Sequence, residues 1–178
     1  MTTDIICAGF GGQGVLTVGM ILASAGMKTG KQITWYPSYG SEMRGGTANC
    51  TVRFGDEAIA SPYAKTLDIL FAMSGPAVDK FEMRLKPGGL LLVNTSVAKE
   101  KRSYRSDMRT CFVPAAEIAE GVPNGTAKGA NMVMLGVFCK ETGLFPPDAF
   151  IRLIDEYFEE HGKKNPQNAV YFMAGYNT

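Results

Sequence analysis

The feature that most constrains this chain is the glycine-rich segment GFGGQG, residues 9–14, which joins two apolar stretches. Residues 4–8 form a short apolar run typical of a buried strand, and residues 14–29 carry apolar side chains at helical spacing. A glycine turn between a strand and a helix is the context of a phosphate-binding loop, because residues without Cβ atoms adopt positive φ and let an anion approach the backbone. The first amides of the helix add unpaired donors and a positive dipole end.

This segment predicts an anion site, and packing of a tight turn by glycines alone is the alternative. The candidate binding residues are Gly9, Gly11, Gly12, Gln13 and Gly14. Three of these glycines fit GxGxxG, but a dinucleotide-binding fold would add an acidic residue roughly twenty residues later, at the end of the second strand. Residues 32–37 read QITWYP and contain no acid and no arginine. A nicotinamide or flavin dinucleotide is therefore disfavoured, and without a GxxxxGK[ST] motif so is a P-loop nucleotidase.

A second loop, SYGSEMRGG at residues 38–46, follows the strand predicted at residues 32–36. A guanidinium next to glycine amides suits recognition of phosphate or carboxylate. Because both loops follow strands of one predicted βαβ unit, they could flank one ligand crevice at the carboxyl edge of the sheet. An ion pair between Glu42 and Arg44 that merely fixes the loop or an interface is the open alternative. The candidate residues of this loop are Tyr39, Glu42, Arg44, Gly45 and Gly46.

The rest of the chain continues an α/β pattern. An antiparallel hairpin is predicted from residues 48–54 and 57–60, strands at 67–73, 90–94 and 111–114, and a helix at 77–85; the charge-dense stretch 97–109 indicates a solvated edge or loop. Helices are predicted at residues 114–120, 127–142, 147–161 and 166–176. The fold class expected is a Rossmann-like three-layer α/β sandwich with a mostly parallel sheet, a β-hairpin insertion and a helical C-terminal part. We expect one domain over residues 1–178.

Composition excludes several function classes. Eighteen basic and seventeen acidic residues give a net charge of +1, which argues against nucleic-acid partners. The N-terminal segment lacks the charge and the apolar length of a signal peptide or membrane span, so a cytoplasmic protein without membrane contact is expected. Four cysteines, without a CxxC pair, predict buried reduced thiols and no metal site. The single histidine, His161, is expected to cap a helix end, and Asn165 before Pro166 is expected to cap the start of the last helix.

At these motifs the chain resembles the gamma subunit of 2-oxoacid:ferredoxin oxidoreductases, the family of the 2-oxoglutarate, 2-ketoisovalerate and pyruvate ferredoxin oxidoreductases. The resemblance rests on both glycine loops, on residues 49–53 and 60–62, on KPGGLLLVN at 86–94 and on KGANMVMLG at 128–136. It implies an assembly that oxidatively decarboxylates a 2-oxoacid on thiamine diphosphate, reduces ferredoxin through iron–sulfur clusters and forms an acyl-coenzyme A.

The resemblance also implies a division of labour. Thiamine diphosphate and the iron–sulfur clusters are expected on alpha, beta and delta-type partner subunits, and coenzyme A at the surface of this chain, whose ten candidate residues match the family's motifs. No residue here is expected to be catalytic. The alternatives from other function classes are a stand-alone nucleotide- or flavin-binding oxidoreductase and a purely structural subunit. The motifs do not select one 2-oxoacid.

Overall fold

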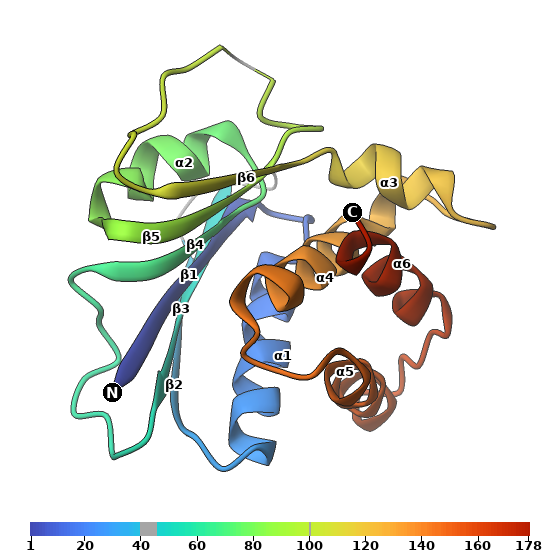
Figure 1. Cartoon of the computed structure of the whole chain (residues 1–178). Coiled ribbons are helices and arrows are strands. Elements are labelled where there is room, and N and C mark those ends of the chain that lie inside the picture. The colour runs from blue at the N-terminus through green and yellow to red at the C-terminus, as the bar shows by residue number, and fades with distance from the viewer. Residues whose placement is uncertain (40–45, 100) are drawn as a thin grey trace. The chain divides into compact units, whose positions relative to one another are not determined.

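The computed structural model describes residues 1–39, 46–99 and 101–178, and the chain divides into two compact units, Met1–Phe112 and Val113–Thr178. Within the described residues, a six-stranded sheet has the order β2-β3-β1-β4-β5-β6 (Figure 1). Its strands are β1 (Thr2–Phe10), β2 (Gln32–Tyr39), β3 (Thr47–Gly55), β4 (Leu67–Ala72), β5 (Leu85–Asn94) and β6 (Arg109–Val113). The first unit also contains the helices α1 (Val15–Lys28) and α2 (Gly75–Phe81).

The strand directions confirm the Rossmann-like, mostly parallel sheet. Strand β4 is parallel to both β1 and β5, whereas β3 is antiparallel to both β1 and β2. Because β2 and β1 are both antiparallel to β3, β2 runs in the same direction as β1, β4 and β5. Strand β3 alone among these five is reversed, and it separates the two strands of the predicted βαβ unit.

The position predicted for the hairpin is wrong. Residues 48–54 do form a strand, but β3 pairs with β1 and β2, and residues 57–60 form no strand. The reason is burial: Cys50 and Val52 on one face of β3 and Thr51 on the other face are buried. A strand buried on both faces lies inside the sheet, where the exposed residues 56–58 cannot serve as its neighbour. The hairpin partner is β2, which continues through Pro37 because an edge strand tolerates proline.

The helix predicted at residues 77–85 ends earlier in the structure, where α2 covers Gly75–Phe81. Ser74 caps α2 through its hydroxyl, which accepts a hydrogen bond from the amide of Ala77, and a 3-10 turn covers Glu82–Arg84. Strand β5 then begins at Leu85, which pairs with Leu67 of β4. Pairing with a distant strand therefore places Leu85 in a strand, although its local apolar spacing is equally compatible with a helix.

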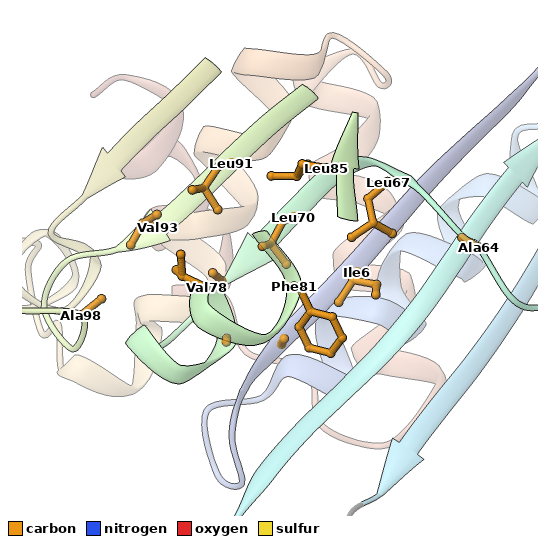
Figure 2. Close-up of a cluster of buried hydrophobic side chains, with 13 residues drawn as sticks. Ile6, Ala64, Leu67, Leu70, Val78, Phe81, Leu85, Leu91, Val93 and Ala98 are labelled. Atoms are coloured by element: carbon orange, nitrogen blue, oxygen red, sulfur yellow. The ribbon is translucent and has the colours of Figure 1, made fainter. Parts of the chain in front are cut away.

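The sheet of the first unit is covered on both faces, as a three-layer sandwich requires. Helix α1 packs against β1, β2 and β3, and α2 packs against β1 and β4. Figure 2 shows the core on the α2 face, where Ile6 of β1, Leu70 of β4 and Leu91 of β5 meet Val78 and Phe81 of α2. The α1 face carries the alternate residues: a Cβ at Gly19 of α1 would collide with Cys50, and one at Gly26 with Phe54.

The second unit is helical, as predicted. It contains α3 (Ala115–Gly121), a 3-10 turn (Ala127–Gly129), α4 (Ala130–Thr142), α5 (Pro147–Glu160) and α6 (Gln167–Tyr176). The expected caps are also present. His161 ends α5 with its Nδ1 2.6 Å from the carbonyl oxygen of Tyr157, and Asn165 accepts a hydrogen bond from the amide of Gln167 at the start of α6. In the described part of the chain, none of the helices has the length and apolarity that a membrane crossing requires.

Candidate anion site at the carboxyl edge of the sheet

The glycine turn lies where the chain changes from one face of the sheet to the other. Strands β1 and β4 are adjacent and parallel, yet β1 leads into α1 on one face and β4 leads into α2 on the opposite face. Two neighbouring strands whose connections diverge form a topological switch point, and ligands of open α/β sheets bind in the crevice at such points. The turn therefore occupies the position in the sheet at which a ligand crevice is expected.

The turn uses glycine where positive φ is required. Gly12 has φ of 93°, and Gly14 has φ of 74° and is the N-cap of α1. A β-carbon would strain the backbone at both positions. A Cβ at Gly12 would also meet no atom of the described residues within 4 Å, so none of them covers the outer side of the turn.

Gln13 braces the turn from inside the protein. Its Oε1 accepts a hydrogen bond from the amide of Phe10 at 2.7 Å, and its Nε2 donates to the carbonyl oxygen of Met73 at 3.0 Å, just beyond β4. A Cβ at Gly9 would collide with this side chain and with Met73. Sequence reasoning placed Gly9 and Gln13 among the binding residues and did not foresee this bracing role. Their binding of a ligand stays a prediction.

The start of α1 presents a cluster of backbone donors. No side chain caps this helix and its first turn contains no acidic residue. Three amides of the turn are satisfied, because Phe10 donates to Gln13, Gly11 to Gly46, and Gln13 to Phe10. Among the described residues, none accepts a hydrogen bond from the amides of Gly12, Gly14, Val15, Leu16 or Thr17. Such unpaired donors at the positive end of a helix dipole attract an anion.

The second predicted loop meets the first. The amide of Gly11 donates to the carbonyl oxygen of Gly46 at 2.8 Å, and Phe10 pairs with Thr47 where β1 ends and β3 begins. Tyr39 ends β2 opposite Ala48 of β3, so the backbone of all three strands converges at this edge. The prediction that the two loops adjoin is thus confirmed at Gly11 and Gly46. Glu42, Arg44 and Gly45 lie outside the described residues.

Two cysteines far apart in the sequence meet behind the turn, which sequence reasoning missed. Cys7 and Cys50 are directly opposite each other in β1 and β3, and both thiols are buried and reduced. The hydrogen bond between the two thiols raises the pKa of Cys7, and burial raises it further. The same hydrogen bond lowers the pKa of Cys50. The Cys50 thiol also donates to the carbonyl oxygen of Val15 at 3.6 Å, which ties β3 to the first residue of α1.

Cys139 is expected to be nearly inert toward alkylating reagents at neutral pH. Burial raises the pKa of its thiol to about 11, so at pH 8 only about one molecule in a thousand carries the reactive thiolate. We expect iodoacetamide to modify the half-buried Cys111 first, and the rate at Cys139 to rise roughly tenfold per pH unit between pH 7 and 9. Peptide mass spectrometry of timed samples measures both rates; equal rates at pH 8 would contradict the assignment.

Comparison with known proteins identifies the family. Residues 4–178 match the family model described as pyruvate ferredoxin/flavodoxin oxidoreductase. The chain is 44% identical over 130 residues to ketoisovalerate oxidoreductase subunit VorA of Methanothermobacter marburgensis, a match that covers 73% of this chain and 26% of VorA. The chain therefore spans about a quarter of the length of that relative.

Two solved structures share the fold. The keto/oxoacid ferredoxin oxidoreductase gamma subunit of Geobacter sulfurreducens matches with a TM-score of 0.79 and 28% identity, over 99% of this chain and 95% of that one. The 2-oxoglutarate:ferredoxin oxidoreductase of Magnetococcus marinus, solved with 2-oxoglutarate, coenzyme A and succinyl-CoA bound, matches with a TM-score of 0.81 and 20% identity, over 99% of this chain and 30% of that one. Because the family model covers nearly the whole chain, the chain belongs to the pyruvate ferredoxin/flavodoxin oxidoreductase family.

Proposed function

We propose that this chain is the gamma subunit of a 2-oxoacid:ferredoxin oxidoreductase and that residues 1–178 act as one gamma-type domain. Family membership over residues 4–178 supports this assignment, as does the near-complete match in both directions to a protein named as a gamma subunit. The complex would oxidise a 2-oxoacid to an acyl-coenzyme A and pass the electrons to ferredoxin. In it, this chain contributes assembly and the positioning of coenzyme A rather than bond chemistry.

The observation that carries the proposal is the glycine turn at the switch point. Coenzyme A carries phosphate groups, and the amides of Gly12, Gly14, Val15, Leu16 and Thr17 donate to none of the described residues. They offer backbone donors at a positive helix pole without a competing carboxylate in the first turn of α1. None of the described residues fills the space beyond Gly12, which leaves room there for a bulky phosphate ester. Arg44, in the second predicted loop, carries a guanidinium of the kind that binds phosphate through two parallel hydrogen bonds.

The remaining cofactors are assigned to partner subunits. Alpha, beta and delta-type subunits would hold thiamine diphosphate and the iron–sulfur clusters, which supply decarboxylation and electron transfer. This assignment is supported by the cysteine pattern, because the four cysteines contain no CxxC pair and Cys7, Cys50 and Cys139 are buried within elements of the fold. Ketoisovalerate, 2-oxoglutarate and pyruvate are the candidate substrates, and the choice among them would rest with the partners.

The test places a negative charge at the helix start. Thr17 is the third residue of α1, where the positive end of the helix dipole stabilises a carboxylate. A carboxylate there can also accept hydrogen bonds from the amides of the first turn. Thr17→Glu should therefore keep or raise the thermal midpoint of the chain while competing with and repelling a phosphate. In the reconstituted complex we expect the apparent KM for coenzyme A to rise about tenfold, equivalent to about 1.4 kcal/mol, while 2-oxoacid-dependent dye reduction is unchanged.

Thr17→Gln is the matched control, because glutamine has nearly the same size as glutamate and no charge. It should leave the apparent KM for coenzyme A within about twofold of wild type. Arg44→Ala is a second arm and should also raise the coenzyme A requirement. If Thr17→Glu and Arg44→Ala both leave the coenzyme A requirement unchanged, the phosphate-binding role is wrong. Loss of subunit association in either variant would instead assign these loops to an interface and support a purely structural subunit.

A further inference from the structure

A second pocket lies on the α2 face of the first unit, on the side of the sheet opposite α1. It has a volume of about 290 Å³, small for a ligand site but sufficient for a compact metabolite. Its floor is built from neighbouring side chains of two paired strands: Ser38 of β2, opposite Asn49 of β3, and Thr51 of β3, opposite Tyr36 of β2. Asn49 and Thr51 are only 8% exposed, so hydrogen-bonding groups lie at the base of the cavity.

Two tyrosines form one wall of the pocket. The rings of Tyr36 and Tyr63 lie 4.8 Å apart between centroids, tilted by 58°, and both are exposed. Hydrogen bonding to Tyr36 raises the pKa of Tyr63, so the Tyr63 hydroxyl is protonated at neutral pH. Large exposed aromatic faces beside a polar floor are the surfaces on which planar rings stack.

Two cations also line the pocket. Lys80 of α2 and Arg84 of the following turn both flank the ring of Phe81, with their charged groups 5.4 and 5.6 Å from its centroid. In the described part of the chain, no carboxylate lies within ion-pair distance of either cation. The pocket therefore carries positive charge where α2 and the following turn line it.

The loop that carries Tyr63 is held in place from both sides. Arg53 of β3 donates from its Nη1 to the carbonyl oxygens of Ser61 at 2.6 Å and Tyr63 at 3.1 Å, and its guanidinium is itself fixed by Asp4 at 2.7 Å. From the other side, Arg84 donates to the carbonyl oxygen of Ala64. Because these contacts lie within the protein itself, the loop is held by its own neighbours, which lowers the cost of association.

We propose that this pocket binds a nucleoside-monophosphate-sized ligand, with its planar ring on Tyr36 and Tyr63 and its anionic group between Lys80 and Arg84. Asn49 supplies both a donor and an acceptor for the polar edge of the ring. The site is separate from the glycine turn. The residues of β2 and β3 that line it alternate with those that face α1, so the pocket opens on the other face of the sheet. It adds a second ligand to a chain whose proposed function concerns coenzyme A.

The test titrates the full-length chain with AMP by isothermal calorimetry, with adenosine and inorganic phosphate as probes of each half. We expect AMP to bind at least about tenfold more tightly than either fragment, since one charge-assisted hydrogen bond or one stacked base is worth about 1.4 kcal/mol or more. Lys80→Gln and Tyr63→Ala should each weaken AMP about tenfold. Lys99→Gln removes the same charge from an exposed lysine that does not line the pocket, and should leave AMP binding unchanged.

The outcomes separate this site from the glycine turn. Thr17→Glu should leave AMP binding unchanged, and Lys80→Gln should leave the coenzyme A requirement of the complex unchanged. The proposal is overturned if AMP does not bind, if Lys80→Gln and Tyr63→Ala bind it as tightly as wild type, or if Thr17→Glu abolishes binding. Phosphate that binds as tightly as AMP would also overturn it, because the tyrosine wall would then contribute nothing.

Discussion

Replacing Gly136 with valine is expected to destabilise the helical unit by about 3 kcal/mol. Gly136 lies on the buried face of α4, and a Cβ there would collide with the backbone of α6 at the carbonyl oxygen of Phe172 and the amide nitrogen of Tyr176. Gly175 of α6 makes the reciprocal approach, since a Cβ there would collide with the carbonyl oxygen of Val133. A backbone cannot move aside as a flexible side chain can, so the helices must separate and their shared core must loosen.

Urea unfolding followed by far-ultraviolet circular dichroism measures this loss, because the regular elements that lie wholly within the second unit are all helices. The single tryptophan, Trp35, lies in β2 and reports on the first unit by fluorescence, so the two transitions can be compared in one sample. Gly121→Ala is the matched control: a Cβ at the end of α3 meets no atom within 4 Å, and the substitution should leave stability unchanged or slightly raised. A loss below about 1 kcal/mol for Gly136→Val would show that the helices are not in backbone contact.

Arg53→Met is expected to destabilise the first unit by about 3–5 kcal/mol. The side chains of Arg53 and Asp4 are only 17% and 10% exposed, and their charged atoms lie 2.7 Å apart between β3 and β1. Removing the guanidinium leaves a poorly hydrated carboxylate without its counter-charge, which costs more than the attraction itself contributed. The carbonyl oxygens of Ser61 and Tyr63 lose their donor as well, so the loop beside the tyrosine pocket should loosen.

Urea unfolding followed by Trp35 fluorescence measures this change, since the reporter lies on β2, the neighbour of β3. Lys31→Met is the control. It breaks another ion pair, with Asp56 at 2.5 Å, but both side chains are about half exposed, so water replaces the lost contact and no resolvable change is expected. Double replacement of Asp4 and Arg53 by Asn and Met should recover part of the loss, because no charge is then left unpaired. Equal stability of the Arg53→Met and Lys31→Met variants would contradict the role assigned to burial.

Local signals were sufficient for the elements with strong periodicity and clear ends. Helix α1 was predicted within a residue or two because its apolar spacing is bounded by Gly14 and Gly30, and the caps of α5 and α6 at His161 and Asn165 followed from residue type. The same signals were insufficient at residues 57–60, where a short run next to a turn resembles a strand. A strand exists only where a partner pairs with it, and nothing local identifies β2 rather than residues 57–60 as the partner of β3.

By itself, the sequence determined the fold class, the glycine turn between β1 and α1, and the family, because each depends on residue types at short, fixed spacing. Only the tertiary structure decided that Gly11 meets Gly46, that Gln13 is a brace, that Cys7 faces Cys50, and that two tyrosines and two cations surround one pocket. These juxtapositions join residues up to about sixty positions apart through the register and order of strands. Register is set by burial over the whole sheet, so no short segment of the chain contains it.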